Sequence, residues 1–225
     1  MINLPDVTLI CVSSLNFDNT LFAFRKSMQG INYGAVKLIS DQVPDGFIEN
    51  GISIERCEKI KSIDEYSHYM IFDLHKHVQT SHCLVIQADG FVVNPEQWDP
   101  LWLTYDYIGA PWRYSEDAYI DPWGNHQRVG NGGFSLRSKK LLEVPLNAHV
   151  QFDVNWGTFY KHMNANNTAE DGNICVHNRH VYEVLGCKFA PVEVAARFSY
   201  ENSVPESVGI TPFGFHYHLP PGTQL

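Results

Sequence analysis

Four short segments of the sequence carry side chains that could do chemistry. The first is an apolar run, Cys83 to Gln87, which is followed by Asp89 and Gly90. Ligands of open α/β sheets collect at the carboxyl ends of the strands, so Asp89 could hold a metal or a nucleotide. An Asp-Gly pair is also ordinary turn chemistry. From spacing alone, the ligand role and the turn role are equally favoured.

The second segment contains three glycines in four residues, Gly130, Gly132 and Gly133, just before an apolar stretch. Glycine removes side-chain bulk and permits positive φ, which lets the backbone approach a bound molecule closely. Phosphate-binding fingerprints open a helix directly, and that context is missing here. A bulge or tight hairpin is the structural alternative.

The third and fourth segments contain carboxylates and histidines. Glu170 and Asp171 precede a helical pattern, where the helix dipole and N-capping are a sufficient structural explanation for them. A carboxylate at such a position can also act as a general base. His216 and His218 lie two residues apart on an extended segment. They therefore point to opposite sides, and only one of them is expected to reach a given metal.

The elements that position these residues alternate between strand and helix. Apolar runs predict strands at 7–13, 35–39 and 83–87, and helical spacing predicts helices at 16–29, closing at Gly30, and at 63–78. Such alternation favours parallel strands joined by right-handed crossovers. We therefore predict a doubly wound sheet for this half.

The second half is less regular. We predict a short helix at 96–103, a strand at 107–108, a loop at 111–129, a strand at 133–136, a short helix from Ser138, a helix at 171–185 and a strand at 189–195. Long loops in a compact domain usually have a functional reason, so substrate contacts are expected here. Because no long polar linker interrupts the chain, we predict one domain.

Composition excludes several classes of protein. The 25 acidic and 16 basic residues give a formal charge of −9, which argues against a site for a nucleic-acid backbone. The N-terminus lacks the basic start and cleavage site of a signal peptide, and no apolar run approaches the ~20 residues of a membrane span. We therefore expect a soluble, cytoplasmic protein without membrane insertion. Five scattered cysteines predict buried reduced thiols.

In their order, these segments resemble those of GT-A type nucleotide-sugar glycosyltransferases, and more closely a poorly characterised set of microbial and viral glycosyltransferases. The shared stretches, between Leu84 and His216, are IQADGFVVNP, YDYIGAPW, VGNGGFSLRS, AEDGNICVHNR, FAPVEVAARFS and FGFH. The resemblance implies a single GT-A-like (Rossmann-like) α/β domain over residues 1–225, with a mixed, mostly parallel central sheet flanked by helices. Residues 1–90 would form the nucleotide-binding half and 91–225 the donor-sugar and acceptor half.

The resemblance also implies a metal site. Asp89 corresponds to the last acidic residue of the family's Asp-x-Asp element, which holds a divalent ion against the donor diphosphate. Gln87 stands at the first acidic position, which leaves one charged ligand there and makes the need for metal an open question. His216, rather than His218, is expected to complete the site, with Mn²⁺ or Mg²⁺ favoured by the oxygen-rich ligands.

Further roles follow from the same resemblance. Gly132 and Gly133 are expected to line the donor sugar, and Asp171 or Glu170 to deprotonate the acceptor hydroxyl, with Asp171 preferred. A base opposite the leaving group gives inversion, although a retaining route stays open because sequence does not determine distances.

Three more residues are assigned to the donor. By topology, Ser13 and Asp41 should contact the nucleotide. Arg137 could bind the diphosphate or could equally anchor a structural carboxylate. Flat rings suit stacking on sugars, although burial in a core explains any one of them; the candidates are Trp112, Tyr114, Trp123 and Trp156.

The expected function is metal-assisted transfer of a hexose, from a UDP-sugar in the first instance, to a hydroxyl of a saccharide or glycoconjugate. One alternative is a nucleotidyltransferase or phosphohydrolase, which the neutral Gln87 disfavours. Another is a sugar- or nucleotide-binding module without turnover. An acceptor on DNA or protein stays open, although the net charge disfavours duplex DNA.

Overall fold

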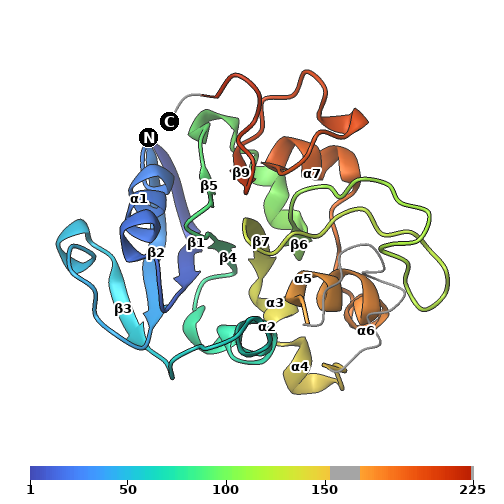
Figure 1. The fold of residues 1–225 in the computed structure, drawn as a ribbon, viewed down its shortest axis with the longest axis horizontal. Coiled ribbons are helices and arrows are strands. Elements are labelled where there is room, and N and C mark those ends of the chain that lie inside the picture. The colour runs from blue at the N-terminus through green and yellow to red at the C-terminus, as the bar shows by residue number, and fades with distance from the viewer. Residues whose placement is uncertain (153–167, 224–225) are drawn as a thin grey trace.

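The centre of this computed structural model, which describes residues 1–152 and 168–223, is a six-stranded sheet with the order β3-β2-β1-β4-β7-β6 (Figure 1). Its strands are β1 (Ile2–Val12), β2 (Ile31–Ser40), β3 (Ser53–Arg56), β4 (His82–Val85), β6 (Tyr107–Ile108) and β7 (Ser135–Ser138). The first four pair in parallel, and β7 is antiparallel to both β4 and β6. The prediction of a mixed, mostly parallel sheet is confirmed.

A second, three-stranded sheet has the order β5-β9-β8. It consists of β5 (Gly90–Val92), β9 (Gly214–His216) and β8 (Ser199–Tyr200). β5 and β9 are antiparallel, with Gly90 opposite His216, whereas β8 and β9 are parallel. This small sheet joins the end of β4 to segments more than 100 residues further along the chain.

Helices cover the sheets on both sides (Figure 1). They are α1 (Phe17–Ser27), α2 (Ile63–Phe72), α3 (Lys139–Leu142), α4 (Val144–Asn147), α5 (Glu170–Gly172), α6 (Arg179–Val184) and α7 (Val192–Phe198). Shorter turns are η1 (Ile48–Asn50), η2 (Leu74–His77), η3 (Pro95–Gln97), η4 (Pro100–Thr104), η6 (Asn173–His177) and η7 (Pro205–Ser207). Ser62 caps α2 by accepting the Glu65 N–H, and Ser138 caps α3 in the same way.

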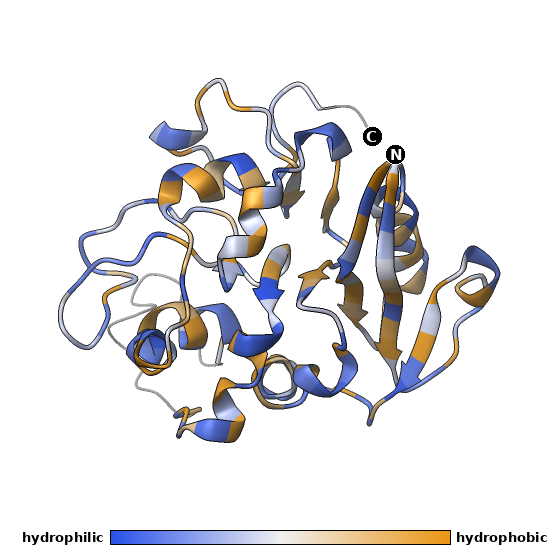
Figure 2. Cartoon of the chain, turned by 180° about the vertical axis from the view of Figure 1, so that it is seen from behind, coloured by the Kyte–Doolittle hydropathy of each residue, from blue (hydrophilic) through white to orange (hydrophobic). Residues whose placement is uncertain are grey.

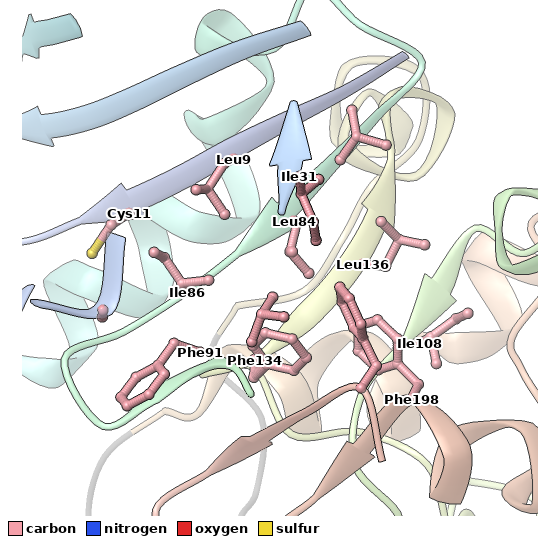
Figure 3. Packing of buried hydrophobic residues seen from close by; sticks show 14 of the residues in the cluster. Leu9, Cys11, Ile31, Leu84, Ile86, Phe91, Ile108, Phe134, Leu136 and Phe198 are labelled. Carbon is pink, nitrogen blue, oxygen red and sulfur yellow. The ribbon is translucent and has the colours of Figure 1, made fainter. Parts of the chain in front are cut away.

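The core consists of two apolar clusters that use opposite faces of the sheet. Leu9 belongs to one cluster and Ile10 to the other, as alternation along a strand requires. Figure 3 shows the first cluster, where Leu84 and Leu136 lie near the rings of Phe134 and Phe198. Figure 2 shows hydrophobic colour along the inner strands. The prediction that the first strand is buried on both faces is therefore confirmed.

Several predicted elements differ in the structure. The predicted strand at 189–195 is wrong, because helix α7 begins at Val192, directly after Pro191, and only Phe189 makes an isolated bridge, to Tyr107. Ala195, Ala196 and Phe198 of α7 are buried, a helical spacing that the β-branched valines obscured. The 96–103 helix is instead two 3₁₀ turns, each beginning at a proline, and the 63–78 helix ends at Phe72.

The helix predicted at 171–185 is divided into α5, the π-helical turn η6 and α6. The Asn178 N–H donates to the carbonyl of Asn173, five residues earlier, which widens the helix at this point. Such turns occur frequently at functional sites. Strand β3 was not predicted, because its four residues are only partly buried and carry no clear alternation.

Candidate active site

The turn after β4 brings three polar side chains together. Gln87 and Gly90 exchange two backbone hydrogen bonds of 2.9 and 3.1 Å, which places Asp89 at the tip of a tight turn. His216 Nε2 lies 3.7 Å from Asp89 Oδ1 and 3.3 Å from Gln87 Oε1. Asp89 is therefore a turn residue whose carboxylate faces a histidine, and its role as a metal or nucleotide ligand stays a prediction.

These three donors fit a divalent cation. Ligand atoms on adjacent positions around one Mg²⁺ or Mn²⁺ lie about 3 Å apart, close to the two separations from His216 Nε2. Gln87 Nε2 donates to the Tyr66 hydroxyl at 2.8 Å, which leaves its Oε1 directed to His216. No cluster of three His, Cys, Asp or Glu suited to a metal occurs within 1–152 and 168–223. A neutral amide in the third position explains this, and such a set needs further oxygens from a bound molecule.

A cavity of about 400 Å³, here the β1 cavity, opens at the carboxyl end of β1. Its walls are the end of β1 with the loop that follows, the start of α2, and the turn after β4. Ser13, which the topology predicts to contact the nucleotide, lines it, and so does Asp89. Asp41 follows β2 but does not line this cavity. Sequence analysis did not single out Lys61 and Ser62, which do.

A second cavity of about 590 Å³, here the acidic cavity, adjoins the first and shares Ile63, Tyr66 and Gln87 with it. It brings together segments that are far apart in the sequence. Among the predicted residues, its lining contains Gln87, Gly132, Gly133, Glu170, Asp171 and His216. Glu201 also lines it. Sequence analysis missed Glu201, because no motif marks it and only the pairing of β8 with β9 brings it to the site.

The glycine segment is required by close packing within the site. A Cβ atom on Gly132 would lie 1.8 Å from Glu170 Oε1, and one on Gly133 would lie 2.1 Å from His216 Nε2. Neither contact is possible for a side chain. The glycines thus allow the backbone to pass directly beside the carboxylate and the imidazole of the same chain, while the predicted close approach to a bound molecule stays a prediction.

Glu170 and Arg137 form a buried ion pair behind the glycine segment. Arg137 Nη2 donates to Glu170 Oε1 at 2.9 Å and to the Gly132 carbonyl at 3.3 Å, and its Nε donates to Ser135 Oγ at 2.9 Å. The Arg137 side chain is fully buried and lines neither of the two cavities. Of the two contacts considered for Arg137, the structure shows the one to a structural carboxylate.

Asp171 differs from its neighbour in having no cationic partner among the contacts the structure records. Its carboxylate accepts the N–H groups of Gly132 at 3.1 Å and Gly172 at 2.7 Å. Burial, followed by repulsion from Glu170 and Glu201, raises the pKa of Asp171 to about 7. A carboxyl group with a pKa near 7 is suited to accept a proton at neutral pH.

Aromatic residues of the 111–129 loop divide into two groups. Trp112 and Tyr119 stack with ring centroids 4.3 Å apart and line the acidic cavity. Tyr114 and Trp123 are exposed, and Trp123 lies against the ring of His180. Trp156 lies outside the described residues.

A third cavity, of about 660 Å³, is larger but chemically poorer. It lies near the C-terminus, and none of its lining residues among those described is acidic, basic or a histidine. Volume alone would have selected it. The chemistry of the lining selects instead the two adjoining cavities at the carboxyl end of the main sheet, where open α/β sheets bind their ligands.

Two solved structures share this architecture. A crystal structure of an active-site mutant of LgtC matches 95% of this chain and 88% of its own, with a TM-score of 0.51 and 12% identity. A glycosyltransferase involved in glycosylation of the major capsid of PBCV-1 matches over 97% and 94%, with a TM-score of 0.51 and 13% identity. At such identities the likeness shows the fold alone, which is that of the GT-A glycosyltransferases.

A weaker likeness is to the mannosyltransferase PcManGT from Pyrobaculum calidifontis, solved in complex with GDP-Man and Mn²⁺. It covers 83% of this chain and 55% of that one, with 11% identity and a TM-score of 0.43, so nothing about this chain follows from it. No curated protein is significantly similar in sequence. Within the described residues, none of the helices has the length and apolarity to cross a bilayer.

A protein family matches the chain by sequence over residues 51–216, which is 166 of the 225 residues. The matched region begins before β3 and ends at His216, so it contains the turn after β4, the glycine segment, α5 and β9. All the side chains of the acidic cavity lie within it. The chain therefore belongs to the family described as "Protein of unknown function (DUF5672)".

Proposed function

We propose that this protein is a glycosyltransferase that moves a hexose from a nucleotide-sugar donor, a UDP-sugar as first choice, to a hydroxyl of a saccharide or glycoconjugate. One observation carries the proposal: the β1 cavity and the acidic cavity adjoin, with Gln87 in the wall of both. The nucleoside would occupy the β1 cavity beside Ser13. The hexose would lie in the acidic cavity beside Gly132 and Gly133. Residues 1–90 would then bind mainly the donor nucleotide, and residues 91–225 mainly the donor sugar and the acceptor.

The linings of the two cavities carry more negative than positive side chains. Four carboxylates line them, against the two cationic residues Lys61 and Arg113; the carboxylates belong to Asp89, Glu170, Asp171 and Glu201. A bound diphosphate would therefore benefit from an accompanying cation. Asp89 and His216, with the Gln87 amide oxygen, would hold Mn²⁺ or Mg²⁺. Such an ion supplies electrostatic stabilisation of the negative charge on a departing diphosphate.

Asp171 is the proposed base. It lines the acidic cavity, has a pKa raised to about 7, and makes no ion pair with the residues that the structure describes, whereas Glu170 is held by Arg137. In the reaction, Asp171 takes the proton of the acceptor hydroxyl as the acceptor oxygen bonds to the anomeric carbon. The bond from that carbon to the diphosphate oxygen breaks with its electron pair. Attack from the face opposite the leaving group gives inversion.

The test separates donor binding from transfer. Thermal stabilisation by UDP, GDP and their sugars is measured with Mn²⁺ and with a chelator, and products are followed by mass spectrometry with an acceptor panel. We expect Asp89→Ala to lose the Mn²⁺-dependent stabilisation, and Asp171→Asn to keep it while losing transfer. Asp45→Ala, at an exposed site remote from both cavity linings, is the matched control.

Two results would contradict the proposal. Stabilisation by UDP that ignores metal and survives in Asp89→Ala would remove the donor site from the border between the two cavities. Metal-dependent binding with no product from any nucleotide sugar would leave a binding module without turnover. The cytoplasmic location expected from the sequence stays a prediction.

A further inference from the structure

Glu201 stands beside His216 because of the way the small sheet is paired. Strand β8 pairs with β9 in parallel, with Ser199 opposite Gly214 and Tyr200 opposite Phe215. The next step in this register places Glu201 beside His216. On its other side, β9 pairs with β5, which follows the turn that contains Asp89. The sheet thus holds His216 between two carboxylates.

The two nitrogens of the His216 ring face different groups. Nδ1 lies 3.4 Å from Glu201 Oε1 and 3.0 Å from the amide nitrogen Nδ2 of Asn131. Nε2 lies 3.3 Å from Gln87 Oε1 and 3.7 Å from Asp89 Oδ1. His216 and Glu201 are each only 18% exposed at their side chains, so water competes weakly for these contacts.

A neutral imidazole carries one N–H, and its location decides what the ring can do. Acceptors lie on both sides of the ring, so the tautomer depends on which of them is stronger. The Glu201 carboxylate lies 3.4 Å from Nδ1, whereas on the Nε2 side the carboxylate of Asp89 is more distant, at 3.7 Å, and the nearer acceptor, Gln87 Oε1 at 3.3 Å, is neutral. A charged acceptor binds an N–H more strongly than a neutral one, so Glu201 favours the proton on Nδ1. The Asn131 amide can present its oxygen to the same N–H if it is reversed, and that oxygen is buried without a partner in the present orientation. With the proton on Nδ1, the lone pair of Nε2 points to Gln87 and Asp89.

We propose that Glu201 is a positioning residue that holds His216 in the Nδ1–H form, so that Nε2 is free to bind the divalent cation together with Asp89 and Gln87. Histidine ligands of metals commonly donate their other N–H to a carboxylate in this way, and loss of that partner typically costs about 10- to 100-fold in metal affinity. This inference rests on the proposed function in one respect, which is that the cation would serve the binding of the donor diphosphate.

The first experiment reads the tautomer directly, in the protein without added metal. Long-range ¹H–¹⁵N NMR of ¹⁵N-histidine-labelled protein distinguishes Nδ1–H from Nε2–H at about pH 9, where imidazole is neutral. The His216 signals are assigned by their loss in His216→Asn. We expect Nδ1–H in the wild type and a shift toward Nε2–H in both Glu201→Gln and Glu201→Ala. Glu193→Gln, at an exposed site on α7, is the matched control.

The second experiment measures Mn²⁺ affinity in the presence of UDP, from the free Mn²⁺ signal in electron paramagnetic resonance. A loss of about 10- to 100-fold in the Glu201 variants, with none in Glu193→Gln, is expected. A wild-type ring in the Nε2–H form, or Glu201 variants that keep Nδ1–H, would overturn the inference. If the wild type binds no Mn²⁺ at all, the proposed function fails, and the tautomer comparison still decides the role of Glu201.

Discussion

At the scale of single residues, the adjacent carboxylates Glu170 and Asp171 show how much a partner matters. Glu170 faces a buried guanidinium and Asp171 faces backbone N–H groups and a cavity. The two carboxylates therefore differ in their contacts, a difference that the sequence of the pair alone does not reveal. One carboxylate is required for the architecture, and the other is available for chemistry.

The raised pKa of Asp171 predicts the pH dependence of transfer. A base must be ionised to accept a proton, and burial raises the pKa of this group to about 7. We therefore expect kcat/KM to fall about tenfold per pH unit on the acid side of that value. The measurement is kcat/KM with saturating Mn²⁺ between about pH 5 and pH 9. A profile that stays flat down to the ordinary range of a carboxyl group would exclude Asp171 as the base.

Gly133 predicts a second effect at this scale. In Gly133→Ala, the new Cβ would meet His216 Nε2 at 2.1 Å and Gln87 Oε1 at 2.8 Å, so the histidine must move away from the proposed cation site. We expect the apparent affinity for UDP in the presence of Mn²⁺, measured by thermal stabilisation, to fall at least tenfold, which corresponds to about 1.4 kcal/mol of binding free energy. Gly124→Ala is the control, because a Cβ there meets no atom within 4 Å, although its positive φ adds some strain. Equal affinities in Gly133→Ala and wild type would show that the ring does not bind the cation.

At the scale of elements, the ion pair between β7 and α5 holds the glycine segment in place. Replacing Glu170 by Gln leaves the fully buried Arg137 charge without its counter-charge, which typically destabilises a protein by about 3–5 kcal/mol. Urea unfolding at neutral pH measures this loss. An effect within the error of the measurement would mean that Arg137 has another anion nearby.

Asp171→Asn is the matched comparison for Glu170→Gln, and we expect it to raise the free energy of unfolding rather than lower it. The folded-state pKa of Asp171 is about 7, above the ordinary value of 3.8, so its contribution to stability is fully present at low pH and is lost as pH rises toward 7. We expect Asp171→Asn to be more stable than wild type above pH 7, with the difference vanishing below about pH 4. Stability gained where activity is lost is common at active sites.

At the scale of the whole molecule, two sheets meet so that their ends form one composite site. The main sheet supplies the β1 cavity, and the small sheet carries Asp89, His216 and Glu201 to its border. The acidic cavity is completed by α5 and the 111–129 loop. In Figure 1 these segments range from the blue strand β1 through the green start of β5 to the orange helix α5 and the red strand β9, so the site requires the complete fold.

This arrangement predicts where ligands perturb the structure. With the diamagnetic ion Mg²⁺, UDP should shift backbone amide signals of Ser13 to Asn16 and of Lys61 to Ile63, which line the β1 cavity. A UDP-hexose should shift these and also Gly132 and Asp171, which line the acidic cavity. Two-dimensional NMR titration tests the order. Shifts confined to residues 207–212, in the third cavity, would place the nucleotide elsewhere.

Sequence by itself determined the parts of this protein that depend on local pattern. Continuous apolar runs predicted β1, β2 and β4, and helical spacing with Gly30, whose φ is 74°, predicted α1 and its end. The glycine segment, the acidic pair and the Asp-Gly turn were also visible as types of residue. Helix α7 was wrongly predicted as a strand, because valine is typical of strands and seven residues are too few to distinguish the helical period of 3.6 residues from the strand period of two.

Only the tertiary structure decided which of these residues meet. Glu170 and Asp171 are neighbours in sequence, yet Glu170 forms an ion pair with the buried Arg137, whereas Asp171 accepts a backbone N–H group. Glu201 carried no local signal, and it reaches His216 only through the register of two short strands. The physical reason is that hydrogen-bond partners, burial and repulsion act over distances in space, while a sequence pattern reports only distances along the chain.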